Sequence, residues 1–441
     1  MQTKRIKSSA LAAAAMSAVL MLTGCANNGA GAAPGTGDAD GKVTLNFWTF
    51  WGSETRRPVI EKMIADFNAS QDRIVVKHTY VPFSDIWTKN LAAIAAGNPP
   101  DVIVNDINGT ALRAHKNQNL NLSQFLQQDP SLKDRFYPEL WKSVMYKDEP
   151  YALPFNTDTR MMFYNKQAFR EAGLDPEKFP QTWAELAEVA EKLDKKNGDQ
   201  YERIGYAPQY GGFQWDVLMT NFDGGTGFFD KNGQPAVNTP AKLEALQYVK
   251  SYADRIGAKN LDQFKAGFGN NQSNPFITGK VAIWPEAVTF QTQLRDYGKG
   301  LDYGIAPIPE KAPGAGHLSV GGGFVLEIPR GAKHPAEAFE FMKYLTDTGP
   351  QTHWAQKNFD NVANKAASND PQLQSDPVYQ AAVENLKVTK LYPTPLHAPD
   401  YKNLIQPQVD AAINGEMDPK AALDQAQADV ENLIKQNTGG E

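Results

Sequence analysis

The order of strands and helices near the start of this chain restricts its fold more than any other feature. Apolar residues alternate over 43–48, as in a half-buried strand, and 74–76 and 101–104 form two further short apolar runs. Between these runs, apolar residues at helical spacing predict one helix around 60–67 and another around 86–94. Strands that alternate with helices predict a parallel sheet with helices on both faces. Because ligands bind at the carboxyl ends of strands in such sheets, the residues that follow each strand are the first site candidates.

The rest of the chain is richer in predicted helices. Thr182 and Glu185 have the spacing of a capping box, and an Asp-Pro pair at 418–419 precedes a terminal amphipathic segment. A chain of 441 residues exceeds what one hydrophobic core usually fills, so two domains are expected. The chain leaves the first domain near Pro154 and returns to it near Gly321, and several such crossovers predict a hinge.

The first residues have the layout of a secretory signal peptide. Basic residues precede an apolar stretch over 10–22, which is well short of the roughly 20 residues that span a bilayer. The run Leu22–Cys25 resembles a bacterial lipobox, which implies cleavage before Cys25 and lipid on its sulfur. We therefore expect a signal peptide over 1–24, a flexible tether over 25–41 and an anchor on the extracytoplasmic face of the bacterial membrane. The alternative is an ordinary signal peptide with a chance cysteine.

Composition excludes several classes of function. Cys25 is the single cysteine, so no disulfide is expected, and a net charge of −6 argues against binding nucleic acid or anionic lipid. The six histidines lack metal-ligand spacing, and no phosphate loop or hydrolase motif is present. The sequence thus predicts no metal, no cofactor and no catalytic residues. A pair of carboxylates acting as a glycosidase stays open, because sequence singles out no pair.

Five short segments follow one another along the chain in an order typical of one protein family. They are Phe47–Ser53, Gly97–Ile103, Leu153-Pro154 leading to Tyr164–Lys166, Gly279–Ala282 and Gly321–Gly323. The set resembles the extracellular solute-binding proteins (family 1) of carbohydrate ABC transporters, in the maltose-binding protein superfamily. The resemblance implies a two-lobed α/β fold of the periplasmic-binding-protein type II, in which each lobe is a sheet flanked by helices and hinge crossovers join the lobes.

The resemblance also implies boundaries and a function. Residues 42–155 and 320–350 would form the N-terminal lobe, and 156–319 and 351–441 the C-terminal lobe. The protein would be a monomer that captures a mono- or oligosaccharide between the lobes and delivers it to an ABC permease. Two alternatives stay open: a binding protein for a non-sugar solute, and a secreted carbohydrate-active enzyme.

A sugar site needs flat aromatic rings together with carboxylates and amides that pair with hydroxyls. The residues expected to bind ligand after the first and third strands are Trp51, Ser53, Glu54, Asn105, Asp106 and Asn108. Each has a structural alternative. Glu54 would favour the start of a helix, and the Asn and Asp residues would favour a turn.

The remaining candidates rest largely on the resemblance. They are Asp158 at the first crossover, Phe213 and Trp215, Trp284 and Glu286 after a strand, Gly322 and Gly323, and Tyr401. Asp158 falls where the maltose-binding protein has a binding glutamate, although Arg160 could pair with it structurally. This chain has glycines where that protein has a stacking tyrosine, so Phe213 or Trp215 would substitute, and core packing is the alternative for Trp215.

Overall fold

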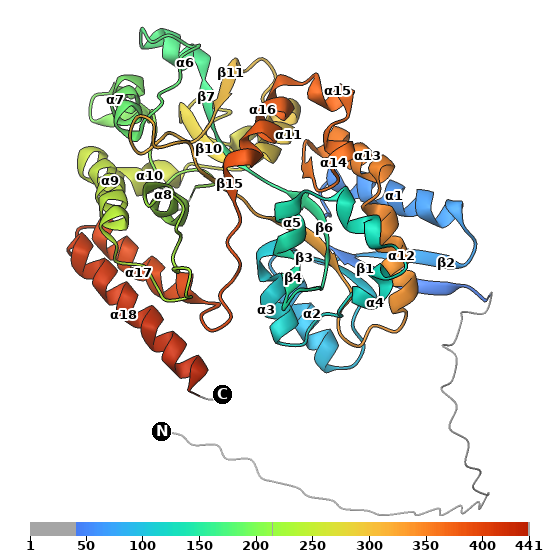
Figure 1. Cartoon of the computed structure of the whole chain (residues 1–441). Helices are drawn as coiled ribbons and strands as arrows, with labels where there is room; N and C mark the ends of the chain where they lie inside the picture. Colours follow the sequence, from blue (N-terminus) through green and yellow to red (C-terminus); the bar gives the residue numbers. More distant parts are fainter. Residues whose placement is uncertain (1–40, 214, 440–441) are drawn as a thin grey trace, which may run out of the picture. The chain divides into compact units, whose positions relative to one another are not determined.

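The computed structural model describes residues 41–213 and 215–439 (Figure 1). The predicted signal peptide, Cys25 and nearly all of the predicted tether therefore lie outside the described residues. Within the described part, every helix is too short or too polar to cross a membrane.

The first sheet begins as the alternation of strands and helices predicts. Strand β1 (Val43–Thr49) pairs in parallel with β2 (Ile74–Tyr80) and with β3 (Val102–Asp106). Helix α1 (Arg56–Ser70) connects β1 to β2, and α2 (Ile86–Ala95) connects β2 to β3. The parallel register places the carboxyl ends of the three strands at one edge of the sheet.

Later parts of the chain complete this sheet. Strands β6 (Leu153–Thr157), β13 (Gly323–Glu327) and β14 (Asn361–Val362) join it in antiparallel pairs, which gives the order β14-β6-β13-β3-β1-β2. Helices α12 (Pro335–Leu345) and α13 (Thr348–Asn358) contribute buried residues to the same hydrophobic core. The chain therefore leaves this sheet after β6 and returns to it at β13.

A second core surrounds a smaller sheet. Its strands are β7 (Arg160–Asn165), β10 (Ile283–Ala287) and β11 (Tyr303–Ala306), with β7 in the centre and both pairs antiparallel. Among the helices that contribute buried residues to this core are α7 (Trp183–Leu193), α9 (Pro240–Ile256), α17 (Tyr401–Ile413) and α18 (Pro419–Thr438). The predicted capping box begins α7, where Glu185 N donates to Thr182 Oγ1 at 3.2 Å. Helices α17 and α18 lie side by side (Figure 1). The fold is α/β and two-lobed, as the sequence predicts.

Short elements fill the connections. The other helices are α3 (Thr110–His115), α4 (Ser123–Leu126), α5 (Pro138–Ser143), α6 (Lys166–Glu171), α8 (Trp215–Phe222), α10 (Ala258–Lys265), α11 (Gln291–Tyr297), α14 (Lys365–Ser368), α15 (Pro371–Gln374) and α16 (Pro377–Asn385). The other strands are β4 (Met145–Tyr146), β5 (Glu149–Pro150), β8 (Lys195–Asn197), β9 (Gln200–Arg203), β12 (Ser319–Val320) and β15 (Thr389–Lys390).

The segment after residue 350 does not pack where the sequence placed it. Trp354, Leu373 and Tyr379 are buried in the first core, and β14 belongs to the first sheet. The expected C-terminal lobe of 351–441 therefore contains a stretch that packs with the first lobe. Sequence spacing cannot reveal this, because an apolar helix face does not specify which of two cores it covers.

Three crossings of the chain are hydrogen-bonded to one another. Thr159, between β6 and β7, shares a hydrogen bond of 2.6 Å with the hydroxyl of Thr389 and donates to Ser319 Oγ at 3.1 Å. Asn385 Nδ2 donates to Thr159 Oγ1 at 2.7 Å, and β12 pairs in parallel with β15. The crossings therefore form one bonded unit rather than separate linkers.

Candidate functional site

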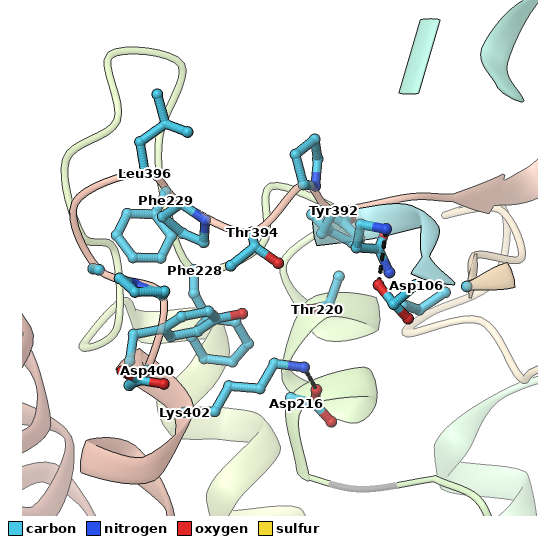
Figure 2. A pocket seen from close by; sticks show the side chains of 18 of the residues that line it. Asp106, Asp216, Thr220, Phe228, Phe229, Tyr392, Thr394, Leu396, Asp400 and Lys402 are labelled. Atoms are coloured by element: carbon cyan, nitrogen blue, oxygen red, sulfur yellow. Dashed lines mark hydrogen bonds and ion pairs between the residues drawn. The ribbon is translucent and has the colours of Figure 1, made fainter. Parts of the chain in front are cut away.

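A large cavity lies where the ends of the first sheet, the crossings and the second core meet. We call it the central cavity. Its volume is about 1170 Å³, compared with about 300–1,000 Å³ for typical ligand pockets. Its lining includes Asp106 at the end of β3 with Asn108 just after it, Asp158 and Arg160 at the first crossing, 320–324 at the second, and the segment 392–403. Figure 2 shows Phe228 and Phe229 on one side and Asp106 on the other.

Asp106 is the last residue of β3, and its carboxylate faces a largely buried environment. Burial raises the pKa of Asp106, and the neighbouring Asp158 carboxylate adds to the effect, whereas Arg113 opposes it. Asp106 Oδ1 accepts the Asn108 backbone N–H at 2.8 Å. The buried Oδ1 of Asn108 has no hydrogen-bond partner among the described residues, and such unsatisfied buried acceptors are uncommon in folded proteins.

A buried ion pair supports this loop from behind. Arg113 donates through Nη2 and Nε to the carboxylate of Glu327, at 2.8 and 2.9 Å, and Nη2 also donates to the backbone oxygen of Asp106 at 2.6 Å. Asn105 donates to Glu327 Oε2 at 2.6 Å. Asn105 therefore faces the supporting pair and not the central cavity.

The first crossing brings a second carboxylate to the cavity. Asp158 Oδ1 accepts the Gly322 N–H at 2.9 Å and Arg160 Nη1 at 3.2 Å, and Arg160 Nη1 also donates to the backbone oxygen of Val320 at 2.7 Å. Gly323 has φ of +143°, and a Cβ there would lie 2.3 Å from the backbone oxygen of Asn156. Only glycine permits this close approach between β13 and β6, and both Gly322 and Gly323 line the cavity.

Aromatic rings gather on the wall opposite Asp106. Tyr401 meets Phe228 at 5.8 Å and Phe229 edge to face at 5.1 Å between ring centroids. Phe83, which is 53% exposed, lines the cavity from the loop after β2. Tyr401 was predicted from the sequence, but Phe83, Phe228 and Phe229 were not. Phe83 could have been found, because it lies just after the end of β2, as Asp106 lies at the end of β3.

The charged groups of the cavity are mostly paired. Lys402 Nζ donates to Asp216 Oδ2 at 2.5 Å, as drawn in Figure 2, and Arg160 is held by Asp158. Among the described residues that line the central cavity, Lys402 and Arg160 are the cationic side chains besides the imidazole of His397. The carboxylates are Asp106, Asp158, Asp216 and Asp400, so the lining carries an excess of negative charge.

The other predicted aromatic residues surround a separate cavity of about 400 Å³, which we call the side cavity. Phe213, Trp215, Trp284 and Glu286 line it, together with Gln209, Phe268 and Gln406. The sequence placed these four residues in one site with Asp106, whereas the structure divides the candidates between two cavities.

Besides Asn105, three other predicted residues line neither cavity. Trp51 is 1% exposed and packs in the first core against Trp354 at 4.4 Å and Phe155 at 4.9 Å between ring centroids. The position expected for it at the cavity is therefore corrected: its large apolar ring is a core side chain. Ser53 Oγ accepts the Arg56 N–H at 3.2 Å at the start of α1, and Glu54 is exposed beside it.

Metal ligation finds no support in the described residues, which contain no group of three or more His, Cys, Asp or Glu suited to an ion.

The chain matches the model of a family described as bacterial extracellular solute-binding protein, over residues 51–352. It is 26% identical over 419 residues to the sn-glycerol-3-phosphate-binding periplasmic protein UgpB of Escherichia coli K12, covering 88% of this chain and 92% of that protein.

Two solved structures extend the comparison. CpMnBP1 with mannotriose bound is 29% identical, with a TM-score of 0.79, over 88% of this chain and all of that one. Maltose-bound MalE3 of T. maritima is 21% identical, with a TM-score of 0.74, over 89% of this chain and all of that one. The second likeness concerns the fold alone.

Proposed function

Because the chain belongs to the bacterial extracellular solute-binding proteins, we propose that it captures a neutral sugar or oligosaccharide and delivers it to an ABC permease. The observation that carries the proposal is the lining of the central cavity. Asp106, Asp158 and the unpaired Oδ1 of Asn108 offer acceptors for hydroxyls, and the Phe228–Tyr401 wall offers an apolar surface for C–H faces. The similar structure with bound mannotriose supports the same class of ligand.

A phosphorylated solute is the alternative that the UgpB relatives raise. A phosphate group needs free cationic donors, and Arg and Lys are the usual ones. Here Arg160 is engaged by Asp158 and Lys402 by Asp216, while Asp106 and Asp400, which form no ion pair with another described residue, add negative charge. A dianion would be repelled, so the lining favours a neutral polyol.

The protein acts outside the cytoplasm in this proposal. The run Leu22–Cys25 would direct lipid attachment to Cys25, and 25–41 would tether a monomeric body to the membrane surface. The ligand would be bound and released unchanged, as in the family's binding proteins.

Packing also suggests revised lobe boundaries. We propose that 42–157 and 321–383 form the N-terminal lobe, and 160–319 and 390–439 the C-terminal lobe, since these segments contribute to separate cores. Thr159 and its bonded neighbours would then be the hinge about which the lobes close on a ligand.

Calorimetric titration tests the proposal directly. The purified protein is titrated with mannobiose, mannotriose, maltose and sn-glycerol 3-phosphate, and the sugar is recovered and analysed by chromatography. We expect saturable binding of a saccharide that is recovered intact. Binding of the phosphate alone would reject the ligand class, and shortened sugar products would show an enzyme instead.

A further inference from the structure

A fully buried lysine lies behind the Phe228–Tyr401 wall of the central cavity. The side chain of Lys242, on α9, is fully buried, and its Nζ donates to Oδ2 of the Asp223 carboxylate, which is 6% exposed. The same Nζ lies over the ring of Phe228, 5.2 Å from the ring centroid. Phe228 lines the central cavity (Figure 2), whereas Lys242 and Asp223 line neither cavity. The ion pair therefore reaches the site through Phe228.

Asp223 organises the turn that leads to Phe228. Its Oδ1 accepts the backbone N–H groups of residues 225, 226 and 227, at 3.1, 3.0 and 3.5 Å. One oxygen of the carboxylate thus holds the turn, while the other holds Lys242. Because Phe228 follows the turn directly, the turn sets the backbone position of that ring.

The third crossing of the chain, at β15, binds the carbonyl groups of the same turn. Lys390 Nζ donates to the backbone oxygens of Gly224 and Gly225 at 3.4 and 3.2 Å, and Tyr392 Oη donates to that of Gly225 at 2.8 Å. The packing is close, since Gly227 has φ of +79° and a Cβ there would lie 2.6 Å from Tyr392 Cε1. The turn is therefore held from two sides, by Asp223 and by the crossing.

Stability alone does not account for this ion pair. Burial lowers the pKa of Lys242, and the hydrogen bond and charge of Asp223 oppose that effect. A buried ion pair is often no more stabilising than apolar side chains of the same volume. It does fix which atoms meet, as a buried polar side chain does when it sets the register of a coiled coil. A role in positioning fits the contacts of Asp223 and Lys242 with the turn and the ring.

We propose that Lys242 and Asp223 are positioning residues for sugar binding. The pair fixes the turn 223–227 against the third crossing and so holds Phe228 in the wall that contacts the ligand. Neither residue touches the ligand itself. The inference rests on the proposed function and adds two residues that set its affinity from outside the cavity.

Calorimetric titration with maltose and mannotriose compares the wild type with Asp223→Asn. The amide keeps an oxygen for the turn but removes the charge that holds Lys242. We expect binding to weaken about tenfold, which is the order of one lost aromatic contact. In a Phe228→Ala background the same substitution should cause no further loss of affinity, because the pair acts through that ring.

Asp194→Asn is the matched control. The Asp194 carboxylate is 9% exposed, accepts the Gly205 N–H at 2.8 Å and pairs with Arg255, but it lines neither cavity. Both variants should unfold at lower urea concentration than the wild type, and only Asp223→Asn should lose affinity. Without ligand, amide hydrogen exchange at residues 225–228 should be faster in Asp223→Asn and unchanged in Asp194→Asn.

The double variant Lys242→Met, Asp223→Ala provides a second test, because it leaves no buried charge unpaired and should fold even where Asp223→Asn does not. It lacks the acceptor of the turn, so it should also bind about tenfold more weakly. Wild-type affinity in a folded variant, or an equal loss of affinity in the Phe228→Ala background, would overturn the positioning role while the proposed function stands. If the wild type binds neither sugar, the proposed function fails and the positioning role fails with it.

Discussion

Removal of Arg113 should destabilise the protein through the carboxylate that it leaves behind. Glu327 is 1% exposed and accepts from both Arg113 and Asn105, whereas the Arg113 side chain is 16% exposed. In Arg113→Met, Glu327 remains buried with the Asn105 amide as its remaining donor among the described residues. Asp106 also loses the hydrogen bond to its backbone oxygen.

The expected cost follows from the burial of each partner. Removing one partner of a buried ion pair costs about 3–5 kcal/mol, and the lower end applies because Asn105 still donates to Glu327. Glu327→Gln should cost less, about 1–3 kcal/mol, because the partly exposed guanidinium can reach water. In the double variant Arg113→Met, Glu327→Leu no charge is left unpaired, so most of the loss should be recovered.

Urea unfolding of the wild type, both single variants and the double variant measures these differences. A surface substitution such as Lys62→Met, which breaks an exposed pair with Asp66, is the matched control and should change stability by less than about 1 kcal/mol. The reasoning is refuted if Arg113→Met costs no more than this control. It is also refuted if the double variant is less stable than Arg113→Met alone.

Four further predictions address other parts of the chain. Cys25→Ser should move the protein from the membrane to the soluble fraction, or leave an unprocessed precursor; a mature-sized chain that stays on the membrane would contradict the anchor. Trp51→Ala should lower the free energy of unfolding by about 3–5 kcal/mol, because a buried ring leaves a cavity; an unchanged denaturant midpoint would show that the ring is not a core element. Asp106 has a raised pKa in the folded state, so the folded state binds more protons than the unfolded state above pH about 4, and stability from this group falls as pH rises. Asp106→Asn should therefore be stabilised relative to the wild type, increasingly so from pH about 4 towards neutral, and a pH-independent difference in unfolding free energy would contradict this. Small-angle scattering should give a smaller radius of gyration with saturating sugar, and an unchanged radius would argue against lobe closure.

Local patterns in the sequence predicted those features that depend on near neighbours. The alternation over β1–β3 predicts a parallel sheet, and Thr182 with Glu185 predicts a helix start; both are present. Asp106 was predicted as a site residue because it lies at the end of a predicted strand, and it lines the central cavity. Local sequence is enough here, because the apolar run that predicts a strand also predicts where that strand ends. The family resemblance was confirmed by the matching family model.

Which aromatic ring faces ligand was decided by the tertiary structure. Trp51 and Phe83 both follow strands of the first sheet, yet Trp51 is 1% exposed and Phe83 is 53% exposed. The sequence cannot separate them, because burial depends on whether another element, here α13 with Trp354, packs over the ring.

The sequence by itself determined the α/β class and the carboxylate at the end of β3, since each follows from short-range periodicity or from ordered motifs. Only the tertiary structure decided that 354–379 pack with the first core and that the aromatic candidates divide between two cavities. The physical reason is the same in both cases. Burying an apolar surface against any complementary face removes it from water and lowers the free energy. The partner of that surface is therefore selected by the whole fold rather than by its neighbours in the sequence.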